Sequence, residues 1–183
     1  RQGAVLLGVI QAAAVSDDRD TQRLTFKACR LLLGILKLKE VLPEVERMMF
    51  EVPQEVRHGF ITGLVAMNGP DAAACLRRVL ERTDDPNLRG YAITALGMNK
   101  GEGTNAMLWE LAAKASDETA RVQFMKALAG RAENLPRMAE RLRSAPLPEA
   151  ERRALLEGLA CVGWNGSAAQ KRAIWDLYEA EPA

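Results

Sequence analysis

Residues 84–116 read DDPNLRGYAITALGMNKGEGTNAMLWELAAKAS, a pattern that predicts two helices joined by a short turn. Asp85 can cap the first helix by accepting a hydrogen bond from a free backbone N–H, and Pro86 suits the first helical position, where its missing N–H costs no bond. Asn99 and Gly101 are expected to end this helix, the glycine because it adopts the left-handed backbone conformation at little cost. A second helix is expected after the turn.

Apolar residues recur at helical spacing in both predicted helices. They are Leu88, Ala92, Ala95 and Leu96 in the first helix, and Leu108, Leu111, Ala112 and Ala115 in the second. Each set lies on one face of its helix, so each helix has one apolar side to bury.

The same pattern returns along the chain with a period of about 32 residues. The leucine near the end of the first helix recurs as Leu32, Leu64, Leu96, Leu128 and Leu159, at separations of 32, 32, 32 and 31. In the same register lie arginines (Arg57, Arg89, Arg121, Arg152), small residues (Gly63, Ala95, Ala127, Gly158) and helix starters (Pro53, Asp85, Asp117, Pro148). A period of 20–50 residues is typical of a solenoid built from stacked repeats.

The motif Asp-x-x-x-Arg-x-x-Ala-x-x-Ala-Leu-Gly at residues 85–97 resembles the HEAT repeat, in particular the short form of phycobilisome lyase-type proteins. The resemblance extends over roughly residues 21–180. It implies a ladder of aspartates and arginines between neighbouring repeats, which Asp85/Arg89 and Asp117/Arg121 match. Prolines replace the aspartate at Pro53 and Pro148, so the ladder is expected to be incomplete there.

The register predicts an all-α, right-handed α-solenoid of about five HEAT-like helix pairs plus an N-terminal helix, or about ten or eleven helices. The expected elements are 3–16 alone, then 21–38 with 43–52, 53–67 with 70–82, 85–99 with 104–115, 117–130 with 135–143, and 148–162 with 166–180. Apolar residues of segment 43–52 run one residue late against this register, so a different loop is expected before it. We expect residues 1–183 to form a single domain that belongs to a longer protein or assembly.

The segment 3–16 is apolar almost all round, and such a helix needs cover on more than one side. Contact with another chain or with an upstream repeat is therefore expected through this N-terminal helix. No run of apolar residues is long enough to predict a membrane span.

The composition argues against several kinds of site. Lys and Arg number 25 and Asp and Glu 24, so the overall charge does not point to nucleic acid or to a membrane. Cys29, Cys75 and Cys161 are far apart and only one histidine occurs, which does not suit zinc and favours buried, reduced thiols. We expect no cofactor and a reducing compartment, the bacterial cytoplasm.

The resemblance implies that the second helix of each pair lines the concave, ligand-facing side of the solenoid. Trp109 lies one repeat after Arg77, in a column outside the apolar stripe, and exposed aromatics are enriched at binding hot spots. The candidate partner-binding residues are Trp109, Arg77, Arg78, Arg82, Lys114 and Arg141. The alternative is that Trp109 covers the seam between repeats, half buried.

Basic residues of the second helices also suggest a discontinuous stripe that tracks phosphates. Its members are Arg77, Arg78, Arg82, Lys114, Arg137, Arg141 and Arg172. The alternative is a solvated face in which these cations pair with the interleaved Glu81, Glu110, Glu140 and Asp176.

No catalytic motif accompanies His58, which is expected at the surface. Near the C-terminus, Trp175 occupies the column of Leu80 and Ala112, so it is expected to pack and, with Leu177, to seal the last repeat.

The sequence therefore favours a non-catalytic scaffold or adaptor that binds another protein through the concave face of a HEAT-like solenoid. Two alternatives remain open. One is a nucleic-acid binder with the fold of the HEAT-like DNA glycosylases, which would use the basic stripe. The other is a chromophore lyase or chaperone, which only the type of repeat suggests.

Overall fold

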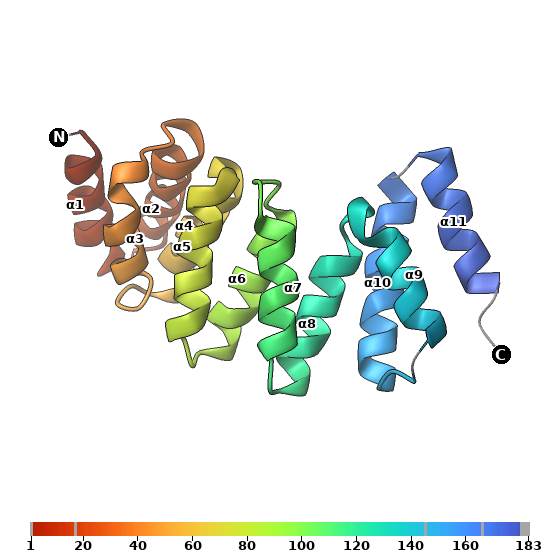
Figure 1. Cartoon of the computed structure of the whole chain (residues 1–183). Helices are drawn as coiled ribbons and strands as arrows, with labels where there is room; N and C mark the ends of the chain where they lie inside the picture. The colour runs from red at the N-terminus through yellow and green to blue at the C-terminus, as the bar shows by residue number, and fades with distance from the viewer. Residues whose placement is uncertain (1, 17, 145, 166, 180–183) are drawn as a thin grey trace. The chain divides into compact units, whose positions relative to one another are not determined.

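The computed structural model describes residues 2–16, 18–144, 146–165 and 167–179 (Figure 1). Within these ranges the chain forms eleven α-helices and no strand, and the predicted all-α solenoid is confirmed. The helices are α1 (Gln2–Ala14), α2 (Arg19–Arg30), α3 (Leu42–Met48), α4 (Gln54–Met67), α5 (Gly69–Arg82), α6 (Pro86–Met98), α7 (Thr104–Lys114), α8 (Glu118–Ala129), α9 (Leu135–Ser144), α10 (Glu149–Asn165) and α11 (Ala168–Glu179). Each corresponds to one of the helices expected from the sequence.

The helices group into two compact units, Arg1–Thr104 and Asn105–Ala183. In the first unit, the first helices of successive pairs, α2, α4 and α6, pack side by side; α3 packs on α5, and α1 packs on α2. In the second unit, α8 packs along α10, which also contacts α9 and α11. The assignment of the whole chain to one domain stays a prediction.

The leucine column forms the centre of each unit. Leu32, Leu64, Leu96, Leu128 and Leu159 are all fully buried, as the 32-residue register predicted. Full burial of one such side chain contributes about 1.5–3 kcal/mol, so the column is a major source of stability in every repeat.

A π-helical turn explains why segment 43–52 is out of step. Helix α2 continues as a π-helix at Leu31–Ile35, and a short 3₁₀ turn at Lys39–Val41 leads into α3. A π-turn holds one more residue than an α-turn, which accounts for the offset of one residue. The late apolar residues Val45 and Met48 are nevertheless buried, as expected.

Asp85 caps α6, as predicted. Its carboxylate accepts hydrogen bonds from the backbone N–H of Asn87 at 2.9 Å and of Leu88 at 3.4 Å. The bond from Asn87 is the main reason that the pKa of the Asp85 carboxyl is lowered, and the bond from Leu88 and the nearby Arg57 act in the same direction. The residue therefore defines where the first helix of its repeat begins.

The expected role of Gly101 is wrong. Among the glycines, positive φ values occur at Gly103 and at Gly69, which precedes Gly101 by one repeat, but not at Gly101 itself. A larger residue would instead clash at position 101, since a Cβ added to Gly101 would lie 2.5 Å from the carbonyl carbon of Gly69. The buried side chain of Asn99 joins the two turns by donating to the Gly69 carbonyl oxygen at 3.1 Å and accepting from the N–H of Gly101 at 2.7 Å.

The ion-pair ladder implied by the HEAT resemblance is present in both units. Arg57 of one repeat donates to Asp85 of the next at 2.6 Å. The expected gap at Pro148 is not observed, because Arg121 pairs with Glu151 at 2.8 Å. Glu151 lies three residues after the proline on α10 and is buried, so it supplies the carboxylate that the proline position lacks.

Burial of two cysteines agrees with the expectation of core thiols. Cys29 and Cys75 are buried without a disulfide, and burial raises the pKa of each thiol to about 12 because it disfavours the charged thiolate. The side chain of Cys161 lies outside the described residues. No helix in the described part of the chain is long and apolar enough to cross a membrane.

Both ends of the array leave apolar side chains at the surface. On α1, Leu7 and Ile10 are buried, whereas Val5 is 67% exposed. The expectation that Trp175 packs is wrong: the preceding residue, Ile174, takes the buried position on α11, and the Trp175 side chain is 60% exposed. The side chain of Leu177, the other expected member of the seal, is not among the described residues.

Candidate functional site

Trp109 lies half buried on α7 and is held in place by two contacts in the second unit. Leu108 and Ala112 face the core, which places Trp109 at the edge of the buried stripe. Its indole N–H donates to the Oδ1 atom of Asn134 at 3.2 Å. The guanidinium carbon of Arg137 lies 3.6 Å from the centre of the indole ring. The half-buried position expected for a seam-covering tryptophan is therefore observed, and one ring face carries a cation.

Asn134 is the residue that anchors this cluster. It is buried at the end of the short 3₁₀ helix Ala132–Asn134. Its amide donates to the Leu128 carbonyl oxygen and to Asn105 Oδ1, both at 2.9 Å, and its Oδ1 accepts from the Asn105 amide at 2.9 Å as well as from Trp109. Because both amide hydrogens and the carbonyl oxygen are used, the network fixes the orientation of the indole ring.

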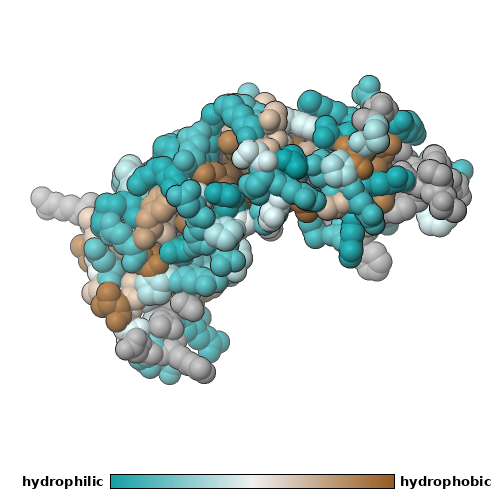
Figure 2. Space-filling model, turned by 90° about the horizontal axis from the view of Figure 1, so that it is seen from below, coloured by the Kyte–Doolittle hydropathy of each residue, from teal (hydrophilic) through white to brown (hydrophobic). Residues whose placement is uncertain are grey.

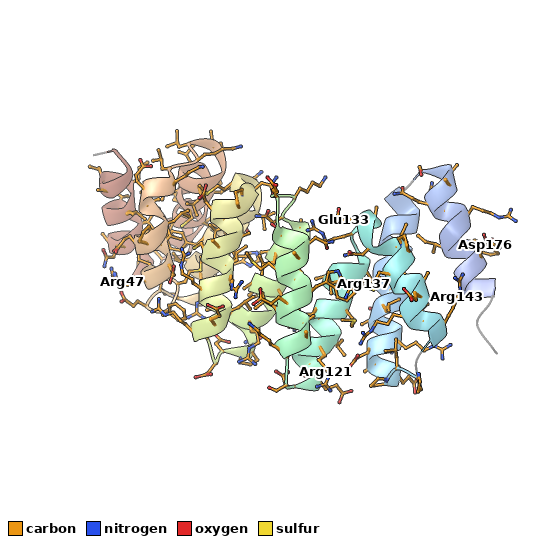
Figure 3. The ribbon with its side chains drawn as sticks, viewed as in Figure 1. Arg47, Arg121, Glu133, Arg137, Arg143 and Asp176 are labelled. Atoms are coloured by element: carbon orange, nitrogen blue, oxygen red, sulfur yellow. The ribbon has the colours of Figure 1, made fainter. Side chains whose placement is uncertain are left out.

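Arg137 presents an open hydrogen-bonding edge. It extends from α9 towards α7 (Figure 3), and stacking on Trp109 uses the flat face of the guanidinium. Among the described residues, no carboxylate lies within ion-pair distance of Arg137. The nearby Glu133, also labelled in Figure 3, pairs instead with Arg131 at 2.9 Å.

The other predicted binding residues lie in both units and are paired with acids. In the first unit, Arg77 pairs with Glu81 at 2.8 Å along α5. Arg78 and Arg82 both donate to Glu46 on α3, at 2.6 and 2.9 Å. The hydrogen bond from Arg78 to Glu46 raises the pKa of the Arg78 guanidinium. Arg78 and Arg82 thus link α5 to α3, whereas Arg77 pairs within α5.

In the second unit, Lys114 pairs with Glu110 at 2.7 Å, and an Nη atom of Arg141 lies 3.7 Å from Glu151. Trp109 and Arg141 thus belong to the same unit, while Arg77, Arg78 and Arg82 belong to the other. A binding role for these residues stays a prediction.

The basic residues therefore sit in a surface of mixed charge. The pairs Arg77–Glu81, Lys114–Glu110 and Arg172–Asp176 have the i,i+4 spacing of a solvated helix face. On the face seen in Figure 2, hydrophilic residues predominate and hydrophobic residues form small, separate groups.

His58 is exposed and packs among aromatic rings. It stacks on Phe26 with ring centres 5.9 Å apart and meets the edge of Tyr91 at 5.2 Å. Within the described residues, no three His, Cys, Asp or Glu side chains are placed to hold a metal ion.

Two open depressions lie on the surface of the described residues. One, of about 630 Å³, lies over α10 beside Leu147, and the other, of about 390 Å³, lies between α1 and Val41. Among the described residues, neither depression is lined by a histidine, cysteine, serine or threonine.

Trp109 and Arg137 could be singled out from the sequence, Arg137 as part of the basic stripe, whereas Asn105 and Asn134 could not. Asn134 directly precedes α9, and asparagine at the start of a helix is usually explained by local turn geometry. Its distance from Asn105 in the sequence, 29 residues, is close to one repeat, and that spacing was the one available signal.

Comparison with known protein families supports the repeat assignment. The family model described as HEAT repeats matches residues 45–129. It does not distinguish the phycobilisome lyase-type form from other HEAT repeats. No curated protein and no solved structure matches this chain.

Proposed function

Residues 45–129 make this chain a HEAT-repeat protein, and from that premise we propose that it is a non-catalytic module that binds another protein around Trp109. HEAT repeats commonly serve as scaffolds for protein interaction. A stack of helix pairs presents an extended surface on which a partner chain can lie.

The observation behind the proposal is the fixed, half-buried indole of Trp109. Binding energy at protein interfaces is concentrated in a few tryptophan, tyrosine and arginine side chains. Such a side chain loses least entropy on binding when it is already ordered. Trp109 is ordered by Asn134 and Arg137, and its side chain is only partly buried, so part of the indole ring stays at the surface.

The alternatives receive less support. Nucleic-acid binding by the basic stripe needs a track of cations that are free to neutralise phosphates. Most cations of the stripe are instead engaged with carboxylates of the same unit, and the net charge is only +1. No feature of the described residues favours a chromophore lyase.

The test compares proteins captured by the wild-type chain, by Trp109→Ala and by Trp175→Ala. Trp175→Ala is the matched control because it removes an exposed indole from another helix of the same unit. Quantitative mass spectrometry should show a protein partner that Trp109→Ala loses and Trp175→Ala retains, while circular dichroism shows equal helix content. Capture that is insensitive to Trp109, or that nuclease treatment abolishes, would contradict the proposal.

A further inference from the structure

We propose that the open edge of Arg137 binds a carboxylate of an acidic segment of the protein partner. The proposal rests on the function proposed above and adds the chemistry of the partner. It is carried by the geometry of the stacked pair and by the charge of α9.

The stacked pair prepares Arg137 for a planar anion. A guanidinium that lies flat on an indole keeps its N–H groups in one plane, pointing away from the ring. A carboxylate accepts two parallel N–H bonds from such an edge, and this bidentate arrangement is both strong and directional. Trp109 is itself held by Asn134, so the plane of the Arg137 guanidinium is set before a partner arrives.

The charge of α9 extends the site by one turn. The segment 135–144 contains three arginines and one glutamate, a balance of +2. Arg141 follows Arg137 by four residues, so the two side chains lie on the same face of the helix. Arg141 is weakly held: its Nη atom is 3.7 Å from Glu151, which Arg121 already binds at 2.8 Å, and its Nε is buried without a hydrogen-bond partner.

An acidic peptide fits these observations better than RNA or DNA does. Two arginines separated by one turn match neighbouring Asp or Glu side chains of one segment. A nucleic-acid strand requires cations spaced along several phosphates. On the adjacent α7, the basic residue Lys114 is occupied by Glu110, so the track does not continue there.

The experiment uses the full chain and fluorescence anisotropy with defined probes. The probes are a labelled peptide in which Asp and Glu alternate with Gly and Ser, the same peptide with Asn and Gln, and a single-stranded RNA of equal length. The variants are Arg137→Lys, Arg137→Ala and Arg153→Ala. Arg153 is a matched control because it is an exposed arginine of α10 in the same unit, paired with Glu157, and its removal changes the net charge equally.

We expect the acidic peptide to bind and the amide peptide to bind at least about 10-fold more weakly, because charged hydrogen bonds are lost. Arg137→Ala should weaken binding of the acidic peptide by about 10-fold or more, because it removes both charged hydrogen bonds. Arg137→Lys should also weaken it, by roughly 5-fold, since it keeps the charge but loses the planar fork. Arg153→Ala should change the affinity less than 2-fold, as expected for an exposed pair.

Several results would overturn the inference: failure of the acidic peptide to bind, equal binding of both peptides, equal effects of Arg137→Ala and Arg153→Ala, or tighter binding of the RNA. Capture experiments with Arg137→Lys separate this failure from that of the proposed function. A partner lost on Trp109→Ala but fully retained on Arg137→Lys means that the surface is right and the carboxylate wrong. A partner that neither variant loses means that the surface itself is wrong.

Discussion

A single methyl group at Gly158 offers a sharp test of how the repeats pack. This glycine lies within α10, where the helix packs against the end of α8. A Cβ added there would lie 2.5 Å from the Cβ of Ala129 and 2.9 Å from the carbonyl oxygen of Lys126. Both atoms lie in the last turn of α8, and neither belongs to the far end of a flexible side chain, so Gly158→Ala forces the two helices apart there.

The magnitude follows from two opposing effects. Overpacking of a close helix contact costs about 1–3 kcal/mol. Replacing glycine by alanine inside a helix returns about 0.5–1 kcal/mol through backbone entropy. An approach of 2.5 Å places the overpacking cost in the upper part of its range, about 2–3 kcal/mol, so the net expectation is a loss of about 1–2.5 kcal/mol in the free energy of unfolding. For a chain of this size that corresponds to a fall of about 2–10 °C in Tm.

Ala160→Gly supplies the control, because Ala160 is exposed on the same helix. This change should cost about 1 kcal/mol through helix propensity alone. Adding its cost to that of Gly158→Ala isolates the steric term. Both variants are followed by urea and thermal unfolding with circular dichroism. A Gly158→Ala protein as stable as wild type, or more stable, would refute the close α8–α10 packing.

Three further outcomes are expected. Asp85→Ala should lower stability by about 0.5–2 kcal/mol at pH 7 through loss of the helix cap. The pKa of the Asp85 carboxyl is lowered in the folded state, so this contribution is complete above the ordinary pKa of the group and is lost below about pH 4. The urea midpoints of wild type and variant should therefore converge in acid. A gap that stays constant with pH would contradict the role of Asp85 as the cap. Glu151→Gln should lower the free energy of unfolding in urea by about 1–3 kcal/mol, because a buried charge-assisted hydrogen bond to Arg121 is lost. Glu149 is exposed on the same helix, so the control Glu149→Gln should lower it by less than about 1 kcal/mol. In a Cys161→Ser background, Cys29 and Cys75 should react with Ellman's reagent only as fast as the protein unfolds, and rapid labelling of the native protein would show that they are not buried.

The repeat architecture was predictable from the sequence because it depends on patterns that any helix must satisfy. A leucine every 32 residues, with small residues beside it, marks the buried face of each first helix, and all five leucines are buried. Helix starts were predictable because proline and capping aspartates act within one turn of the chain. The candidate site was predicted only in part: Trp109 could be placed outside the apolar stripe, but its partners could not be named.

Contacts between different repeats could be established only from the three-dimensional structure. The small-residue column reads Gly63, Ala95, Ala127 and Gly158, yet only the distances show that a Cβ at Gly63 or Gly158 meets the neighbouring helix. The register likewise did not show that Glu151 replaces the missing aspartate. The stacking of Arg137 on Trp109 depends on a turn closed by Asn134. A periodic sequence states which residues share a face, whereas side-chain reach, helix separation and the exact turn decide which of them touch.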